Sequence, residues 1–185
     1  FQSGAISYLY YAERVYQINL ALAGIAVGTV SLPVLSKSIK SKNFLKVFDI
    51  QNKSIQLSLL LSIPASLGLI LASKEIVNGL FGYGSFTLDD VKITSDALRL
   101  FGYGVVAFAL IKILSNFFFA RDNTKIPFYI SVLIVFLNIF ISISFFNQIG
   151  FLIIPIATSI SSWIGVFLFL FILFRKKFIY LKKDL

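Results

Sequence analysis

Apolar residues gather into five long runs along the chain, and polar or charged residues separate these runs. The runs cover about residues 5–35, 54–73, 97–119, 126–147 and 149–174. The hydrocarbon core of a bilayer is about 30 Å thick and a helix rises about 1.5 Å per residue, so about 20 apolar residues span it. In lipid every backbone polar group needs an internal partner, which favours helices for runs of this length. The pattern predicts an all-α integral membrane fold with five transmembrane helices, the last two forming a tight hairpin at 147–150.

The basic residues between the runs predict the orientation of the chain. Twelve lie after the first run, after the third run or in the tail, whereas the opposite side carries only Lys74 and Lys92. Loops rich in Lys and Arg stay in the cytoplasm. The first helix is therefore expected to enter from outside, and the C-terminal tail is expected to be cytoplasmic. The twelve basic residues are Lys37, Lys40, Lys42, Lys46, Lys53, Arg121, Lys125, Arg175, Lys176, Lys177, Lys182 and Lys183.

Composition narrows the class of protein further. The chain is 58% hydrophobic and 14% charged, with a mean hydropathy of +0.90 and neither Cys, Met nor His among its 185 residues. A soluble domain has about a quarter charged residues, so a soluble enzyme is excluded. Without Cys or His there is no Cys/His zinc site, thiol nucleophile or histidine base, and we expect no metal and no cofactor. The net charge of +9 follows from topology and contact with anionic lipid, so no nucleic-acid partner is expected. Because the chain starts at Phe1 and has no Met, both ends are expected to be cuts.

The first run carries a stripe of polar and small residues on one face of an ideal helix. At about 100° per residue, eight such residues fall within an arc of about 100°, with neither Phe nor Leu among them. They are Tyr10, Glu13, Arg14, Gln17, Ala21, Gly24, Gly28 and Ser31. This face is predicted to look toward protein or a water-filled cavity.

Two interpretations of the outer half of this stripe stay open. Either Glu13 and Arg14 neutralise each other and pack the helix, or Arg14 presents its planar, permanently charged donor fork to a phosphate or carboxylate. In the second case Glu13 and Gln17 belong to the same binding site. In the inner half, Gly24 and Gly28 form a GxxxG pair that permits close approach of another helix, as static packing or as a gate.

Other polar side chains lie within the runs, where such groups are costly and often mark a site. Lys112 is about 12 Å inside the cytoplasmic end of the third helix and is a weaker candidate for substrate binding. Arg99 is expected to snorkel to the headgroups from the outer end of that helix, and Asn138 to hydrogen-bond a neighbouring helix. The acidic residues of 89–96 are expected in a solvated external loop.

An ordered set of motifs resembles the MurJ (MviN) family of lipid II flippases. Residues 10–17 and 24–36 read YYAERVYQ and GIAVGTVSLPVLS, as in the eighth helix of that family. FGYGSFT at 81–87, AFALIKIL at 107–114 and ARDNTKIP at 120–127 are similar to its next external loop, its tenth helix and the following cytoplasmic turn. The chain departs from the family at 18–21, where Ile-Asn-Leu-Ala replaces a common Leu-Pro-Leu-Gly, and at Asn116, where the family usually has Pro.

The resemblance implies a fourteen-helix, two-lobe transporter of the MATE-like (MOP) superfamily in the bacterial cytoplasmic (inner) membrane. In this family the lobes alternate around a cationic cavity that receives the headgroup of lipid II, the undecaprenyl-diphosphate-linked peptidoglycan precursor. Arg14 corresponds to one of several cavity arginines, and Glu13 to the acidic residue that usually precedes it. Residues 1–185 then form part of the second lobe, helices eight to twelve, and the N-terminal lobe is a missing partner.

The expected function is lipid II flipping in cell-wall biogenesis, with no bond made or broken and hence no enzyme. Coupling to an ion gradient or to the membrane potential is expected, since moving one charge through 100 mV is worth about 2.3 kcal/mol. Three alternatives remain: another superfamily flippase or exporter such as an O-antigen or polysaccharide carrier, a non-transporting scaffold for cell-wall synthesis, and an intramembrane enzyme on polyprenyl phosphates. The enzyme would need convergent carboxylates, and only Glu13 lies within a run.

Overall fold

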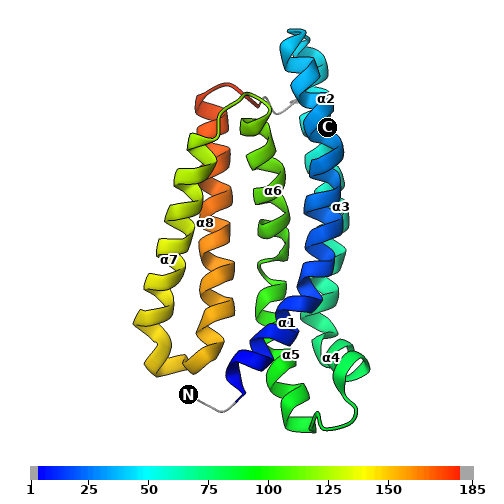
Figure 1. Ribbon diagram of the computed structural model, residues 1–185, viewed down its shortest axis with the longest axis vertical. Helices are drawn as coiled ribbons and strands as arrows, with labels where there is room; N and C mark the ends of the chain where they lie inside the picture. Colours follow the sequence, from blue (N-terminus) through cyan, green and yellow to red (C-terminus); the bar gives the residue numbers. More distant parts are fainter. Residues whose placement is uncertain (1–3, 180–185) are drawn as a thin grey trace.

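The computed structural model describes residues 4–179, and every regular element in this part of the chain is helical. The elements are α1 (Ala5–Leu20), η1 (Ala21–Ala26), α2 (Val27–Lys40), α3 (Phe44–Leu71), α4 (Ser73–Phe81), α5 (Leu88–Gly102), α6 (Val105–Phe119), α7 (Lys125–Ile149), η2 (Gly150–Leu152) and α8 (Ile153–Arg175). Figure 1 shows α6 in the middle of the bundle, with the α7–α8 pair on one side and α2 with α3 on the other. We call the end where α2 meets α3 the basic end, and the opposite end, which holds α4, the outer end. Lys182 and Lys183 lie outside the described residues.

Three helical stretches are long and apolar enough to cross a membrane: Ala5–Lys40, Phe44–Leu71 and Lys125–Arg175. The third folds back on itself at η2, so that α7 and α8 lie side by side (Figure 1). The turn contains Gly150 at a φ of 73°, a conformation that glycine adopts readily. The predicted hairpin and the all-helical class are thus confirmed. The five-crossing layout stays a prediction.

The outer end contains more helix than the sequence predicted. Residues 74–96 were expected in a loop, but α4 occupies part of this segment and α5 already begins at Leu88. The reason is a capping box, in which the Thr87 side chain accepts from the Asp90 backbone and the Asp90 carboxylate accepts from the Thr87 backbone. This pairing satisfies two backbone donors that the first turn of a helix otherwise leaves unpaired. The helix thus begins nine residues before the apolar run at about 97, whose limits as a membrane span stay a prediction.

A break at residues 103–104 divides the third predicted helix into α5 and α6, which meet at an angle of 43°. Three backbone carbonyls beside the break accept hydrogen bonds from other helices. Ser66 of α3 donates to Gly102, Ser159 of α8 to Leu100 and the Trp163 indole to Tyr103, at 2.7, 3.0 and 2.9 Å. Non-helical backbone at membrane depth is tolerated only where neighbours satisfy it. Hydrogen bonds from α3 and α8 therefore stabilise the break.

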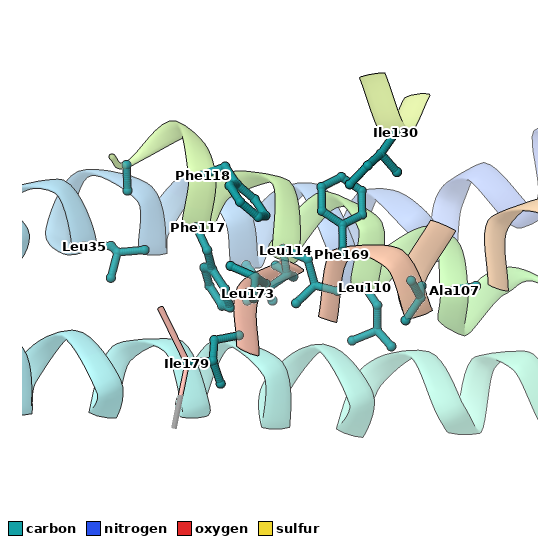
Figure 2. Close-up of a cluster of buried hydrophobic side chains, with 14 of the residues drawn as sticks. Leu35, Ala107, Leu110, Leu114, Phe117, Phe118, Ile130, Phe169, Leu173 and Ile179 are labelled. Atoms are coloured by element: carbon teal, nitrogen blue, oxygen red, sulfur yellow. The ribbon is translucent and has the colours of Figure 1, made fainter. Parts of the chain in front are cut away.

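Two clusters of buried apolar side chains hold the bundle together, and α6 contributes to both. Toward the basic end, Phe117 and Phe118 of α6 pack with Phe169 and Leu173 of α8 (Figure 2). Toward the outer end, side chains of α1, α5 and α6 pack together, among them Tyr16, whose ring lies 4.8 Å from that of Phe101 and 5.3 Å from that of Phe108. This second cluster fixes which face of α1 is buried.

Arg121 fastens the basic end of α6 to the chain that follows α8. Its guanidinium donates to the carbonyls of Phe117 and Phe178, at 2.6 and 3.2 Å, and stacks over the Phe178 ring at 4.3 Å. Burial lowers the pKa of the Arg121 guanidinium to about 10. The side chain therefore remains charged at neutral pH, and its role is structural.

Candidate functional site

Glu13, Arg14 and Gln17 form a hydrogen-bonded chain on the exposed face of α1. The Arg14 guanidinium donates to Oε1 of Gln17 at 3.2 Å, and Nε2 of Gln17 donates to Oε1 of Glu13 at 3.1 Å. The Arg14 guanidinium also lies 4.6 Å from the centre of the Tyr10 ring. The spacing of three and four residues places these side chains on neighbouring turns of one face. The structure thus brings the three predicted residues of the outer stripe together.

Arg14 and Glu13 do not form an ion pair. Within residues 4–179 the only ion pair is between Lys53 and Asp49. Gln17 links the two charges instead, and this link uses one of the five N–H donors of Arg14. Glu13 and Arg14 are thus linked only through Gln17, and both interpretations of the stripe remain predictions. The Arg14 guanidinium is exposed, keeps further N–H donors and is oriented by the Gln17 amide. Such a group is suited to bind a phosphate or carboxylate.

The inner half of the stripe lies on a different face from the outer half. Glu13 and Arg14 are exposed, whereas Gly24, Gly28 and Ser31 are buried. The cause is η1, a π-helical segment at 21–26. A π turn holds about one extra residue, which turns the following helix by about 100° relative to an ideal α-helix. The prediction that all eight residues share one face was wrong for this reason.

Gly24 and Gly28 allow α6 to lie against the first helical stretch. A Cβ added at Gly24 would lie 3.3 Å from Cα of Ala109 and 3.4 Å from Cγ of Lys112. A Cβ at Gly28 would lie 2.6 Å from Nδ2 of Asn116. These contacts fit the packing role that a GxxxG pair commonly has between membrane helices. The gate role stays a prediction.

The remaining polar candidates have different surroundings. Lys112 is exposed beside Gly24, and ten residues, about 15 Å, separate Gly24 from Arg14 along the helix. Lys112 therefore lies at another depth from Arg14. Asn138 donates to Thr158 of α8 at 2.8 Å, which confirms the predicted bond between helices. Arg99 is exposed and lies eleven residues into α5, and its snorkelling to the headgroups stays a prediction.

One contact near the site was missed from the sequence. The Tyr8 hydroxyl of α1 donates to Asp90 at 2.5 Å, which ties the outer end of α1 to the capping box of α5. Asp90 was expected to be solvated in a loop. The spacing Thr87–Asp90 ahead of an apolar run was the available signal for a helix start. No spacing within the sequence relates Tyr8 to Asp90, because the two lie 82 positions apart.

Comparison with known proteins agrees with this architecture. The family model described as lipid II flippase MurJ matches residues 1–185. The chain belongs to the MurJ family. A relative from Rhizobium tropici, named probable lipid II flippase MurJ, is 36% identical over 175 residues, which are 95% of this chain and 33% of the relative. A relative of the same name from Rickettsia prowazekii is 37% identical over 163 residues, which are 88% of this chain and 32% of the relative.

A solved structure of a MurJ protein has the same fold. It is titled lipid II flippase MurJ, inward closed conformation, and it matches with a TM-score of 0.86 at 32% identity, over 97% of this chain and 37% of that one. The chain thus spans about a third of the length of the MurJ proteins it matches. Together with the long apolar helices, membership in MurJ makes it part of a multi-pass membrane protein.

Proposed function

We propose that residues 1–185 are part of the second lobe of a lipid II flippase that works by alternating access in the bacterial inner membrane. Membership in MurJ supports the substrate class. The observation that carries the proposal is the exposed Arg14, which Gln17 orients and no carboxylate neutralises within the described residues. No bond is made or broken, so the protein is a transporter and not an enzyme.

Arg14 would act by replacing water around the diphosphate of the lipid. A diphosphate carries charge that hydrocarbon does not solvate, and a guanidinium offers paired donors that match phosphate oxygens. Arg14 projects from the exposed face of α1, so an opposing lobe is needed to close a cavity over it. Movement of that lobe against this one would expose the site to one side of the membrane and then to the other.

Orientation and coupling complete the proposal. The C-terminal tail is cytoplasmic, because the basic residues gather at the end where α2 meets α3 and where α8 terminates. An ion gradient or the membrane potential drives the cycle, since the charged headgroup moves through the field. The partners are lipid II, the bilayer and the N-terminal lobe of the same protein.

Translocation of lipid II in vesicles tests this function. The protein as encoded, with every segment that flanks residues 1–185, is reconstituted with labelled lipid II, and the label reaching the opposite leaflet is measured. We expect the wild type to translocate it and Arg14→Ala to fall to the level of empty vesicles. Arg175→Ala is the matched control, because Arg175 is also exposed and also lies over an aromatic ring four residues earlier, Phe171, at 5.6 Å.

Each other outcome has a definite meaning. Translocation of a different polyprenyl-linked sugar, but not of lipid II, would favour another flippase of the superfamily. Absence of any translocation by the wild type would favour a scaffold. Wild-type rates for Arg14→Ala would remove Arg14 from the site.

A further inference from the structure

Two pockets, which together we call the groove, lie along the antiparallel pair α2 and α3. Its longer part has a volume of about 570 Å³ and apolar walls, among them Leu22 and Val30 on one side and Leu57 and Leu61 on the other. Its shorter part, about 400 Å³, lies at the basic end and is lined by Lys37 and Lys46. Val34 lines both parts, so they adjoin at this residue.

The spacing of the lining residues shows that the groove follows the helices. Its lining includes positions 27, 30, 34 and 37 of α2 and positions 46, 50, 53, 57 and 61 of α3, each three or four residues apart. Such positions form one stripe on a helix. From Leu22 to Val34 the apolar part extends about 18 Å, similar to the roughly 15 Å of hydrocarbon in one leaflet of a bilayer. The groove thus has about the length of one lipid chain.

The unpaired lysines of the groove lie at one end. Lys37 and Lys46 make no ion pair within residues 4–179, whereas Lys53 on the wall is paired with Asp49 at 2.9 Å. The N-terminus of α3 adds to the positive field at this end, because its 28-residue helix begins at Phe44 beside Lys46. Asn43 caps one of its backbone donors. The basic end therefore attracts an anion, whereas the remainder of the groove is lined mainly by apolar side chains.

We propose that this groove holds one anionic phospholipid of the surrounding bilayer. The phosphate lies between Lys37 and Lys46, and an acyl chain lies along Val30, Leu57 and Leu61. Basic pockets between membrane helices on the cytoplasmic side commonly take such headgroups. An apolar helix from another part of the protein would fill the walls, but it would leave the two lysines without a counter-charge. This site is separate from Arg14 and would serve to anchor the α2–α3 pair in the leaflet.

Photocrosslinking tests the site in the protein as encoded, with its flanking segments, in nanodiscs. Phosphatidylcholine discs contain a small fraction of a phospholipid with a diazirine in its acyl chain, carrying either a phosphatidylglycerol or a phosphatidylcholine headgroup. Labelled peptides are mapped by mass spectrometry. We expect the segments holding Val30 and Leu57 to be labelled at least fivefold more by the anionic lipid.

Two double variants separate the groove from general attraction to the membrane. K37Q/K46Q should abolish the headgroup preference, since each lysine near a headgroup contributes severalfold to binding. K40Q/K42Q removes the same charge from exposed residues of the same connection that do not line the groove, and it should keep the preference. Size-exclusion profiles check that both variants fold.

Three results would overturn the proposal. Equal labelling by the two headgroups would mean ordinary boundary lipid. Labelling of the exposed α7 residues Ile139 and Ile143, with none in the groove, would mean that another protein segment covers it. Equal loss of preference in both double variants would mean that the charge acts without a specific site.

Discussion

The outer and inner halves of the first helical stretch are predicted from the sequence to share one face, but in the structure one half is exposed and the other is buried. In α1, polar residues face outward and the apolar residues Ala12, Val15 and Tyr16 are buried. In η1 and α2, Gly24 and Gly28 of the same predicted stripe are buried against α6. The π segment between them turns one half relative to the other by about 100°. A single helical stretch thereby separates an exposed polar face from a packing face.

The difference teaches that a stripe on a helical projection is a local property. Periodicity relates residues correctly over two or three turns, as for Glu13, Arg14 and Gln17. The same periodicity does not relate residues on opposite sides of the π-helical segment η1, because a π turn holds about one more residue than an α turn. The following predictions test whether the separation at η1 governs both folding and function.

Removal of one residue from η1 should have the largest effect. Deletion of Leu22, an exposed residue, lets the stretch become a regular α-helix. The turn of about 100° is then lost, so α1 and α2 can no longer both bury their apolar faces. We expect almost no folded protein by fluorescence-detected size-exclusion chromatography. Deletion of the exposed loop residue Ser85 is the control and should leave most of the protein folded. Wild-type abundance after deletion of Leu22 would show that the π segment is dispensable.

Loss of the Arg14 side chain should abolish activity and spare the fold. Arg14→Ala removes an exposed group, so we expect normal membrane insertion and no growth complementation. Arg14→Lys keeps the charge without the planar fork and should restore activity only in part. Insertion is measured by membrane fractionation and activity by complementation of a flippase-depleted strain. Reduced insertion of Arg14→Ala would instead assign the residue to packing.

Two small residues of the stripe should respond differently to the same substitution. Gly24 lies against the α6 backbone, so Gly24→Leu overpacks the contact and should destabilise the fold by about 1–3 kcal/mol. Ala21, three residues earlier, is exposed, and Ala21→Leu should leave abundance unchanged.

Access labelling decides between packing and a gate. Cysteines at Tyr10 and Ser31 report access from the two ends to a membrane-impermeant thiol reagent, and the chain has no native cysteine. Normal abundance of Gly24→Leu with labelling shifted to one end would support the gate. Lower abundance, with the ratio of labelling at the two ends unchanged from that of the parent protein, would support packing, which is the outcome we expect from the contacts with α6.

The sequence predicted those elements for which the chain carries a local signal. The α7–α8 hairpin follows from two apolar runs joined at Gly150. The hydrogen bond from Asn138 to Thr158 follows because an amide within a membrane helix commonly bonds to a neighbouring helix. The hydrogen-bonded chain at Arg14 follows from spacings of three and four residues. Each of these depends on residues close in sequence or on a general property of the bilayer.

The features that sequence reasoning missed depend on distant partners. The break between α5 and α6 needs Ser66, Ser159 and Trp163 to satisfy its carbonyls, and these residues belong to α3 and α8. Gly102 and Gly104 flank the break and were the one visible sign of it. The π segment begins at Ala21, the last position of 18–21, where the chain lacks the Pro common in the family. The change of helical register therefore arises without a proline.

The smallest effect is expected at Gln17, which links Arg14 to Glu13 on the exposed polar face. Gln17→Leu removes both hydrogen bonds and leaves Arg14 in place. An exposed hydrogen bond of this kind is worth about 0.5–1 kcal/mol, so lipid II binding to the protein as encoded should weaken by roughly two- to fivefold. The maximal transport rate should not change, because Gln17 orients the guanidinium and does not replace it. Asn19→Leu is the control, since Asn19 is a half-buried amide on the same helix that takes no part in the chain of hydrogen bonds at Arg14. A loss as large as that of Arg14→Ala would mean that Gln17 itself contacts the substrate, and unchanged binding would mean that Arg14 needs no orienting partner.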